Sequence, residues 1–298
     1  KHFGSRSKDG TVVKAVDGVD LDIARGETVG IVGESGCGKS TLARLALRLL
    51  EPSAGEITFD GAEITHAGTG QLKPVRRRMQ AVFQDPLASL NSRMTIAQIL
   101  AEPFSAHGLK PEGGVAARAR ALLEDVGLGG VDTSRRPRQF SGGQLQRIAI
   151  ARGLAVEPEI IVADEPTSAL DPSIQAQIAN LFLQIRRERG IALLIISHDL
   201  DVIGHLSDRI VVMYLGQVVE EAKAADLLST PLHPYAQALL AAAPTLKARR
   251  AKAGRGQILA GDPPNPADAP PGCRFHPRCP LASDRCRTEP PALRTLGD

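Results

Sequence analysis

The sequence predicts an α/β protein organised around a mainly parallel β-sheet, and the distribution of apolar residues carries this prediction. Unbroken runs of Val, Ile and Leu recur along the chain as TVGIVG (28–33), EIIVAD (159–164), IALLIIS (191–197) and RIVVMY (209–214). Helical stretches separate these runs, and strands that helices cover on both faces have such continuous apolar runs. Further strands are expected within residues 11–32, because VDLDI (19–23) alternates apolar with acidic residues.

The best-marked helix follows Asp171 and Pro172, a capping residue and a proline suited to the first helical position. Gly190 is expected to end this helix. One stripe along it consists of Ile174, Ile178, Leu181, Phe182 and Ile185. A second helical region, at about 114–157 with a break near Gly127, lies between two predicted strands and is expected to be an inserted helical subdomain.

The composition is typical of a globular protein with a sizeable core, with 298 residues of which 43% are hydrophobic and 23% charged. The formal net charge of +3 is small for this length and favours neither nucleic acid nor anionic lipid as a partner. No apolar run approaches the roughly 20 residues that span a bilayer, and no signal peptide opens the chain, so we expect a cytoplasmic protein. The first residue is Lys1 rather than Met, which favours a piece of a longer polypeptide.

The segment GESGCGKST (33–41) follows an apolar strand and precedes a helical stretch, as the G-x-x-x-x-G-K-[ST] pattern of phosphate-binding loops requires. Its glycines let backbone N–H groups converge on an anion, and the N-terminus of the next helix adds partial positive charge. We expect Lys39 to reach the β- and γ-phosphates of a nucleotide and Ser40 to ligate Mg²⁺. The loop residues expected to bind the nucleotide are Gly33, Ser35, Gly36, Cys37, Gly38, Lys39, Ser40 and Thr41.

Cys37 is interpreted as a small residue in a tight turn rather than as a redox group. Because it lies at the N-terminus of a helix, its thiol pKa is expected to be lowered. We therefore hypothesise that alkylation of Cys37 blocks nucleotide binding.

Two carboxylates, Asp164 and Glu165, come directly after the apolar strand at 159–163. Placing carboxylates at the end of a buried strand costs folding free energy unless they bind a partner, such as a metal ion or a hydrogen-bond donor. In a phosphate-loop protein, Asp164 is expected to hold the Mg²⁺ ion and Glu165 to act as the general base that polarises an attacking water.

Further segments make a family resemblance specific. FSGGQLQR (140–147) resembles the signature motif of ATP-binding-cassette (ABC) ATPases, and it lies upstream of ADEPTSALD (163–171), as in that family. VFQDP (82–86) resembles the Q-loop of these ATPases, and IISHD (195–199) resembles their switch-histidine segment. With the phosphate loop, these motifs stand in the family's order and cover almost all of residues 11–220.

The resemblance implies a fold and its division into domains. It implies a P-loop NTPase (RecA-like) core, an N-terminal antiparallel β subdomain and an inserted α-helical subdomain. The ATPase domain is expected over residues 1–244, with the helical subdomain at about 86–157. GDPPNPADAPPG (261–272) is rich in proline, so residues 245–298 are expected to form an irregular C-terminal extension.

The resemblance also implies roles for individual residues. Two such domains would face each other head to tail, and the signature residues of one, Ser141, Gly142, Gly143 and Gln144, would contact the ATP bound by the other. Gln84 would contact Mg²⁺ and the attacking water. His198 would contact the γ-phosphate and hold Glu165 and the D-loop around Asp171 in place. Phe3 is assigned to adenine stacking because it is the aromatic residue available upstream of the phosphate loop.

Three segments resemble the oligopeptide/dipeptide importer branch: residues 79–103, 233–244 and 272–280. Residues 89–95 (SLNSRMT) resemble the F-type ATPase subunit of that branch, or the C-terminal half of a fused chain. The resemblance implies ATP-driven peptide import at the cytoplasmic face of the plasma membrane. The implied partners are a second ABC ATPase domain of the D type, two transmembrane permease subunits and, indirectly, an extracytoplasmic substrate-binding protein.

Alternative functions stay open at this point. Nickel and glutathione importers share the same segments, so the cargo is not fixed. A non-transport ABC ATPase acting on DNA or ribosomes would usually carry a long coiled-coil insertion or tandem cassettes, neither of which this sequence shows. A small-molecule kinase with a phosphate loop would have no use for a signature motif.

Three of the four cysteines, Cys273, Cys279 and Cys286, stand close together near the end of the chain. A disulfide is not expected in a cytoplasmic protein. These thiols could ligate zinc together with His276, whereas iron–sulfur clusters prefer four cysteines. The resemblance favours a [4Fe–4S] cluster, although no fourth cysteine follows before Asp298. The expected cofactors are therefore ATP and Mg²⁺, with an iron–sulfur cluster or zinc in the extension.

Overall fold

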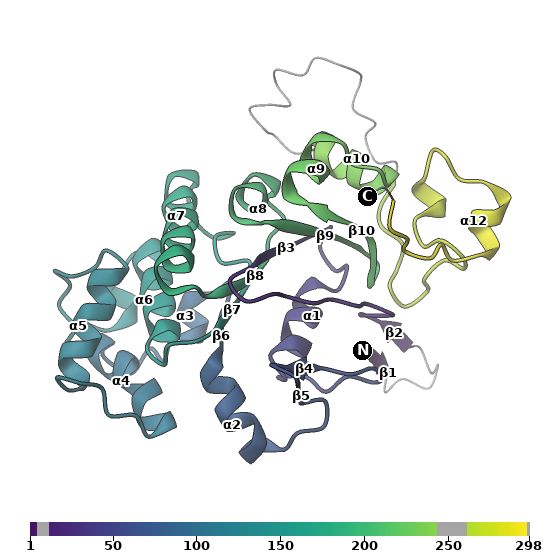
Figure 1. The fold of residues 1–298 in the computed structure, drawn as a ribbon. Helices are drawn as coiled ribbons and strands as arrows, with labels where there is room; N and C mark the ends of the chain where they lie inside the picture. Colours follow the sequence, from purple (N-terminus) through teal and green to yellow (C-terminus); the bar gives the residue numbers. More distant parts are fainter. Residues whose placement is uncertain (5–11, 243–260, 297–298) are drawn as a thin grey trace.

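The computed structural model describes residues 1–4, 12–242 and 261–296. A six-stranded sheet of order β10-β9-β3-β8-β7-β6 forms its centre (Figure 1). The strands of this sheet are β3 (Thr28–Val32), β6 (Met79–Val82), β7 (Ile160–Asp164), β8 (Ala192–Ile196), β9 (Arg209–Tyr214) and β10 (Gln217–Lys223). All neighbours pair in parallel except β10, which runs antiparallel to β9 at one edge. The predicted mainly parallel sheet is confirmed.

Both faces of the sheet are covered, which explains why the strand sequences are apolar throughout. Every residue of β3, β7 and β8 is buried. Helix α1 (Lys39–Ala46) packs Leu42 and Leu45 on one face, in a core that includes Val162 and Ile196. Helices α7 (Pro172–Arg189) and α8 (Leu200–Leu206) cover the opposite face, in a core that includes Ile161 and Ile195. Successive strand residues thus enter opposite cores, as the pleat of a strand requires.

Helix α7 begins and ends where the sequence predicts. Asp171 is its N-cap, Pro172 its first residue and Gly190 its C-cap, although the Asp171 side chain makes no capping hydrogen bond. The predicted stripe faces the core, with Ile178, Leu181, Phe182 and Ile185 buried and Ile174 partly buried.

The chain between β6 and β7 is helical and forms the subdomain at the left of Figure 1. Its α-helices are α3 (Pro86–Ser89), α4 (Ile96–His107), α5 (Val115–Asp125) and α6 (Gly142–Leu154). The helical region predicted at 114–157 comprises α5 and α6, and the predicted break near Gly127 follows α5. Because β6 and β7 are neighbours in the sheet, this subdomain is an insertion between adjacent strands.

Two small antiparallel pairs, β1 (His2–Gly4) with β2 (Val12–Lys14) and β4 (Thr58–Phe59) with β5 (Ala62–Glu63), lie in the N-terminal part, followed by α2 (Thr69–Arg78). The strand expected over VDLDI (19–23) is wrong, because this segment belongs to no sheet. Its side chains nevertheless alternate, with Val19, Leu21 and Ile23 packed against the core. An extended chain alternates its side chains whether or not a partner strand is present.

After β10 come α9 (Ala224–Ser229) and α10 (Pro234–Ala242). The predicted boundary at 244/245 lies outside the described residues. Residues 261–296 are largely irregular, as expected, except for a 3₁₀ turn (His276–Arg278) and α12 (Asp284–Thr288). This part, yellow in Figure 1, lies on the side of the core away from the helical subdomain.

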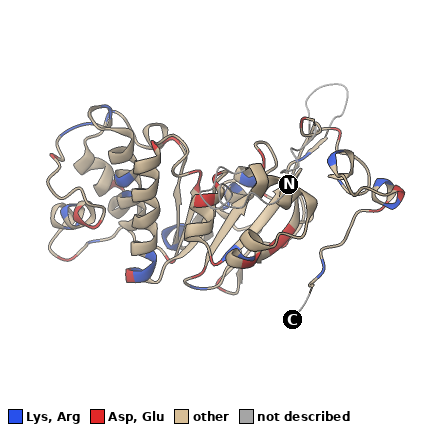
Figure 2. Cartoon of the chain, turned by 90° about the horizontal axis from the view of Figure 1, so that it is seen from above, with Lys and Arg blue, Asp and Glu red and all other residues tan. Residues whose placement is uncertain are grey.

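Charged residues of both signs are interspersed over the core and the helical subdomain (Figure 2). Within the described ranges, we find no helix that combines the length and the apolar character needed to cross a bilayer.

Candidate nucleotide-binding site

The phosphate loop, residues 33–41, connects β3 to α1 at the edge of the sheet where the parallel strands end. Gly38 has a φ of 107°, and a Cβ built there would lie 2.0 Å from the carbonyl oxygen of Ala15. Only glycine fits this backbone conformation and this close approach. Ser35 and Gly36 are exposed at the tip of the loop, and Thr41 is partly buried in the first turn of α1.

Lys39 is the first residue of α1, and it is only 5% exposed. Its Nζ donates hydrogen bonds to the carbonyl oxygens of Gly33 (2.8 Å) and Glu34 (2.9 Å). The ammonium group therefore lies within the loop itself, at the N-terminus of a helix. A phosphate bound there would meet both the fixed lysine charge and the helix N–H groups.

Ser40 and Asp164 lie together at the floor of the loop. The Ser40 hydroxyl donates a hydrogen bond of 2.9 Å to Oδ1 of Asp164, the last residue of β7. Burial raises the pKa of the Asp164 carboxyl, an effect that the Ser40 hydrogen bond and the positive charges of Arg44 and Lys39 oppose. Hydroxyl and carboxylate oxygens are the hard ligands that Mg²⁺ prefers, so this pair fits a magnesium ion.

Glu165 and His198 follow the neighbouring strands β7 and β8, and their side chains approach each other. Nδ1 of His198 lies 3.4 Å from Oε2 of Glu165. The backbone of Glu165 is in the left-handed region, with φ 48°, and its N–H donates to the carbonyl oxygen of Ile196 at 2.9 Å. Such a conformation is uncommon for a residue other than glycine, and it occurs where surrounding contacts fix a functional side chain.

Gln84 completes the group of candidate residues at this edge. It is exposed and lies two residues beyond β6. Because β3, β8, β7 and β6 are adjacent and parallel, the phosphate loop, His198, the two acidic residues and Gln84 all follow strand ends on the same edge of the sheet. The structure thus places together residues that lie as far apart in the sequence as 33 and 198.

The signature residues lie at the start of α6, in the helical subdomain. Ser141 is the N-cap, and its Oγ accepts the N–H of Gln144 (3.4 Å), while its own N–H donates to Oε1 of Gln144 (3.0 Å). A Cβ on Gly143 would lie 2.7 Å from the Ile174 side chain, so glycine is required where α6 approaches α7. Over the described residues, no hydrogen bond joins 141–144 to the phosphate loop of the same chain.

Two further predicted residues have clear positions. Asp171 is exposed at the start of α7. Phe3 pairs with Val13 between β1 and β2, is 39% exposed, and has Lys1 Nζ 5.3 Å from its ring centroid. Because Ala15 follows β2 and approaches Gly38, this strand pair borders the phosphate loop.

The expectation of a lowered thiol pKa at Cys37 is wrong. Cys37 is 3% exposed, and burial raises its pKa despite the nearby charge of Lys39. The dipole of a helix N-terminus does not compensate for the loss of solvation when the thiol points into the core.

The predicted iron–sulfur or zinc site is not supported. Cys273, Cys279 and Cys286 are free thiols, and the described residues contain no group of three or more Cys, His, Asp or Glu side chains that could hold a metal. His276 turns its Nδ1 toward the carbonyl oxygen of Cys273 (2.9 Å). The described residues therefore do not support a [4Fe–4S] cluster or a zinc ion in the extension.

Sequence reasoning missed Glu34 of the phosphate loop and two residues that contact it. Tyr235 and Arg278 both hydrogen-bond to Glu34, the second residue of the loop. Their segments, HPY (233–235) and CRFHPRC (273–279), served only as marks of a resemblance. A buried tyrosine and an arginine between cysteines were the available signals, but neither indicates its partner.

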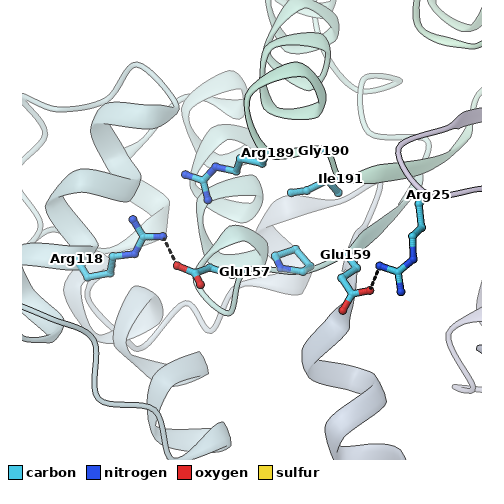
Figure 3. Close-up of a pocket in the computed structure, with 8 residues that line it drawn as sticks. Arg25, Arg118, Glu157, Glu159, Arg189, Gly190 and Ile191 are labelled. Atoms are coloured by element: carbon cyan, nitrogen blue, oxygen red, sulfur yellow. Dashed lines mark hydrogen bonds and ion pairs between the residues drawn. The ribbon is translucent and has the colours of Figure 1, made fainter. Parts of the chain in front are cut away.

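A separate hollow lies at the opposite edge of the sheet, where β7 and β8 begin (Figure 3). Arg118 pairs with Glu157 (3.3 Å), Arg25 with Glu159 (3.1 Å) and Arg189 with Asp125 (2.5 Å). Because each of these arginines already has a carboxylate partner, the hollow is a poor anion site and does not compete with the phosphate loop.

The comparisons with known proteins identify the family. Residues 16–168 match the family model described as ABC transporter. This chain belongs to the ABC transporter family. Residues 219–286 of the chain match a second family model, described as oligopeptide/dipeptide transporter, C-terminal region. The membership confirms the predicted P-loop NTPase fold and the ATPase activity.

Relatives of the cassette match over most of their length. The oligopeptide transport ATP-binding protein AppF of Bacillus subtilis is 48% identical over 95% of this chain and 86% of its own. The oligopeptide transport ATP-binding protein OppF of Escherichia coli is 47% identical over 94% of this chain and 84% of its own. A solved ATP-binding cassette, a dimer in a post-hydrolysis state with ADP and Pi, superposes with a TM-score of 0.68 at 32% identity, covering 75% of this chain and 95% of that chain.

Proposed function

We propose that this cassette is the ATP-hydrolysing subunit of a peptide importer. The observation that carries the catalytic part is the convergence, at one edge of the sheet, of Lys39 in its loop, the Ser40–Asp164 pair and the Glu165–His198 pair. The relatives named as oligopeptide transport proteins and the match of residues 219–286 support the peptide cargo.

Residues 33–41 bind the triphosphate in this proposal. Backbone N–H groups of the loop and Lys39 neutralise the β- and γ-phosphates, and Phe3 stacks on the adenine. Ser40, Asp164 and Gln84 would hold Mg²⁺, which would supply positive charge beside the phosphates. Burial raises the pKa of the Asp164 carboxyl, and a cation bound beside it would favour the ionised form that ligates the metal.

Glu165 acts as the general base. Its carboxylate lies at the end of β7, next to the metal-binding Asp164, and can take a proton from an attacking water. His198 holds that carboxylate from the next strand and reaches the γ-phosphate. Asp171 lies downstream of the same turn, in the segment that faces a partner cassette.

A second cassette domain is required to complete the site. Ser141, Gly142, Gly143 and Gln144 lie at an exposed helix start on the same chain, where their N–H groups are available to the γ-phosphate of ATP bound by a facing subunit. The partner would be a D-type subunit or half-chain. Two permease subunits and, indirectly, a substrate-binding protein would place the cassette at the cytoplasmic face of the plasma membrane.

We further propose that residues 1–244 form the ATPase domain, with the helical subdomain at 86–157, and that 245–298 form an extension. A metal cluster in the extension is not part of the proposal, because we find no group of ligands for a metal among the residues that the structure describes. A nickel or glutathione importer is the alternative cargo class, since it would use the same ATP site.

Two substitutions test the catalytic assignment on the full chain. Glu165→Gln should keep MgATP binding and lose ATP turnover by about a thousandfold, since it removes the base but no phosphate ligand. Lys39→Ala should weaken MgATP binding itself. The exposed Glu112→Gln is the matched control and should retain both. Near-normal turnover by Glu165→Gln would overturn the assignment of the base.

Co-purification from the native membrane tests the transport assignment. Recovery of two permeases with a peptide-binding protein is the expected result, and a nickel- or glutathione-binding protein in its place would reassign the cargo. Recovery with ribosomes or DNA, and without a permease, would contradict a role in transport.

A further inference from the structure

Glu34 is the point at which the C-terminal part of the chain meets the phosphate loop. Its N–H donates to the Tyr235 hydroxyl (2.8 Å), and its two carboxylate oxygens accept from Nη1 (2.7 Å) and Nη2 (3.0 Å) of Arg278. Its carbonyl oxygen accepts from Nζ of Lys39 (2.9 Å). One residue thus connects the C-terminal residues on one side to the phosphate-binding lysine on the other.

Tyr235, in α10, is a rigid partner for the Glu34 N–H. It is fully buried, and its ring centroid lies 4.7 Å from that of Tyr214 and 5.5 Å from that of Phe275. Burial raises the pKa of its hydroxyl, so the group is neutral and accepts the hydrogen bond. Since the ring is enclosed on several sides, its oxygen fixes the position of the loop backbone at residue 34.

Arg278 forms a bidentate ion pair with Glu34 that is largely shielded from solvent. Its side chain is 5% exposed and that of Glu34 is 25% exposed. Its guanidinium lies 5.9 Å from the Tyr214 ring centroid and also donates to the Tyr214 hydroxyl (3.4 Å). An arginine fork restrains a carboxylate in both distance and orientation, which a single charge cannot do.

Further contacts hold the extension beside the loop. Phe275 is buried against Tyr214, and Arg274 bonds to Asp17 and to the carbonyl oxygen of Leu215. These contacts do not involve the phosphate loop itself. Arg278 is therefore the residue through which a docked extension acts on the loop.

We propose that Tyr235 and Arg278 are positioning residues for the phosphate loop, and that the C-terminal extension sets nucleotide affinity through Glu34. This inference rests on the proposed function of the loop as the ATP site. Neither residue touches the reacting atoms. They hold Glu34, whose carbonyl oxygen in turn orients Lys39. Because coupling between sites is reciprocal, MgATP should also strengthen the docking of residues 273–279.

The test compares MgATP affinity and steady-state ATP turnover for the full-length chain and its variants. Tyr235→Phe and Arg278→Gln should each weaken MgATP binding about tenfold, while kcat at saturating ATP stays within about twofold, because a charged or buried hydrogen bond is lost without loss of a catalytic group. Tyr235→Phe removes a single oxygen and keeps the aromatic packing. Adding Arg278→Gln to Glu34→Gln should cause no further loss.

Two arginines of the same extension serve as controls. Arg285, whose side chain is 81% exposed and pairs with Glu289, should be replaceable by Gln without effect. Arg274→Gln removes the bonds to Asp17 and Leu215 but no direct contact to Glu34, so it should weaken MgATP binding less than Arg278→Gln does. Hydrogen exchange provides a second readout, in which MgATP should slow exchange in residues 273–279 of the wild type and not of Arg278→Gln.

The possible outcomes separate this inference from the function on which it rests. If the wild type binds MgATP no better than Lys39→Ala does, the proposed ATP site is wrong. If the wild type binds through Lys39, but Tyr235→Phe and Arg278→Gln bind equally well, the positioning role is overturned. A fall in kcat at unchanged affinity would also overturn it.

Discussion

The phosphate loop (33–41) and the cysteine stretch (273–286) are two short segments that stand out in the sequence, yet their conspicuous residues behave differently. In the loop, the residues that define the motif make the contacts, since Lys39 bonds to the loop backbone and Ser40 to Asp164. In the stretch, the cysteines are free thiols, of which Cys273 and Cys279 pack partly buried against the core. The specific contacts come instead from Phe275 and from the arginines Arg274 and Arg278. A sequence motif predicts function when the residues of the motif make the functional contacts among themselves or with a predictable strand end. A contact between distant segments has no such signal in the sequence.

The largest expected effect concerns whether the cysteine stretch is part of the core at all. Phe275→Ala should lower the free energy of unfolding by about 3–5 kcal/mol, because a ring that is 1% exposed would leave a cavity between Tyr214 and Tyr235. Denaturant unfolding measures this change. Leu281→Ala, at a position 74% exposed in the same stretch, should change it by less than about 0.5 kcal/mol. Equal values for the two variants would show that the stretch is a loose appendage.

A smaller effect distinguishes the residues packed against the two regions, His233 beside Phe275 and Asp164 beside Ser40, by their response to acid. Burial lowers the pKa of His233, which contacts Phe275, from 6.5 to about 4. Between these values the unfolded chain binds more protons, so the stability contributed by neutral His233 is present above pH 6.5 and is lost as pH falls toward 4. We expect a loss on the order of 2 kcal/mol, allowing for partial exposure. Asp164 at the phosphate site acts in the opposite direction, since its raised pKa favours the folded state on protonation.

Urea unfolding between pH 4 and 7 measures how the free energy of unfolding depends on pH, and variants of the two residues separate their opposite contributions. His233→Asn, which keeps a hydrogen-bond acceptor for the Tyr235 N–H, should flatten the curve in this range. Asp164→Asn should instead make the acid loss steeper, because it removes the opposing contribution. A pH profile unchanged by His233→Asn would contradict the buried, neutral imidazole.

The smallest effect on function is expected from the thiols themselves. Hydrogen bonds from Ser283 lower the pKa of Cys286, whereas burial raises that of Cys37. Iodoacetamide should therefore label Cys286 before Cys37, as followed by peptide mass spectrometry. Cys286→Ser should leave ATP turnover within about twofold of the wild type. Labelling of Cys37 as fast as Cys286 would show that the phosphate loop opens more readily than its packing indicates.

The sequence predicted those parts of the fold whose signals are local. The strands around Ile161, Leu194 and Val211 are continuous apolar runs, and α7 carries its cap, its stripe and its terminal glycine within one segment. By the same reasoning, the positions of Lys39, Asp164 and His198 followed from strand ends. Their convergence required only that the strands be parallel and adjacent.

The features of the fold and the site that the sequence did not predict depend on contacts between distant segments, which local sequence does not specify. VDLDI has the alternation of a strand but no neighbour to pair with, and β10, which sequence analysis did not predict, pairs along the edge of β9. The Glu34–Arg278 pair joins residues 244 positions apart, and neither sequence neighbourhood indicates the other. The buried state of Cys37 was missed because the motif fixes its place in the loop but not the direction of its side chain.

The insertion of the helical subdomain between β6 and β7 has a mechanical consequence. The chain leaves the sheet after Val82, at the carboxyl edge, and returns at Ile160, at the amino edge of the neighbouring strand. At about 3.3 Å per residue, these two connections lie roughly 10–15 Å apart. A rotation of the subdomain about the line between them leaves both connections unstretched, whereas a translation strains at least one. The two connections are therefore hinge points for a rotation, with Gln84 beside one and the Arg118–Glu157 ion pair beside the other, while α6 also packs against the core.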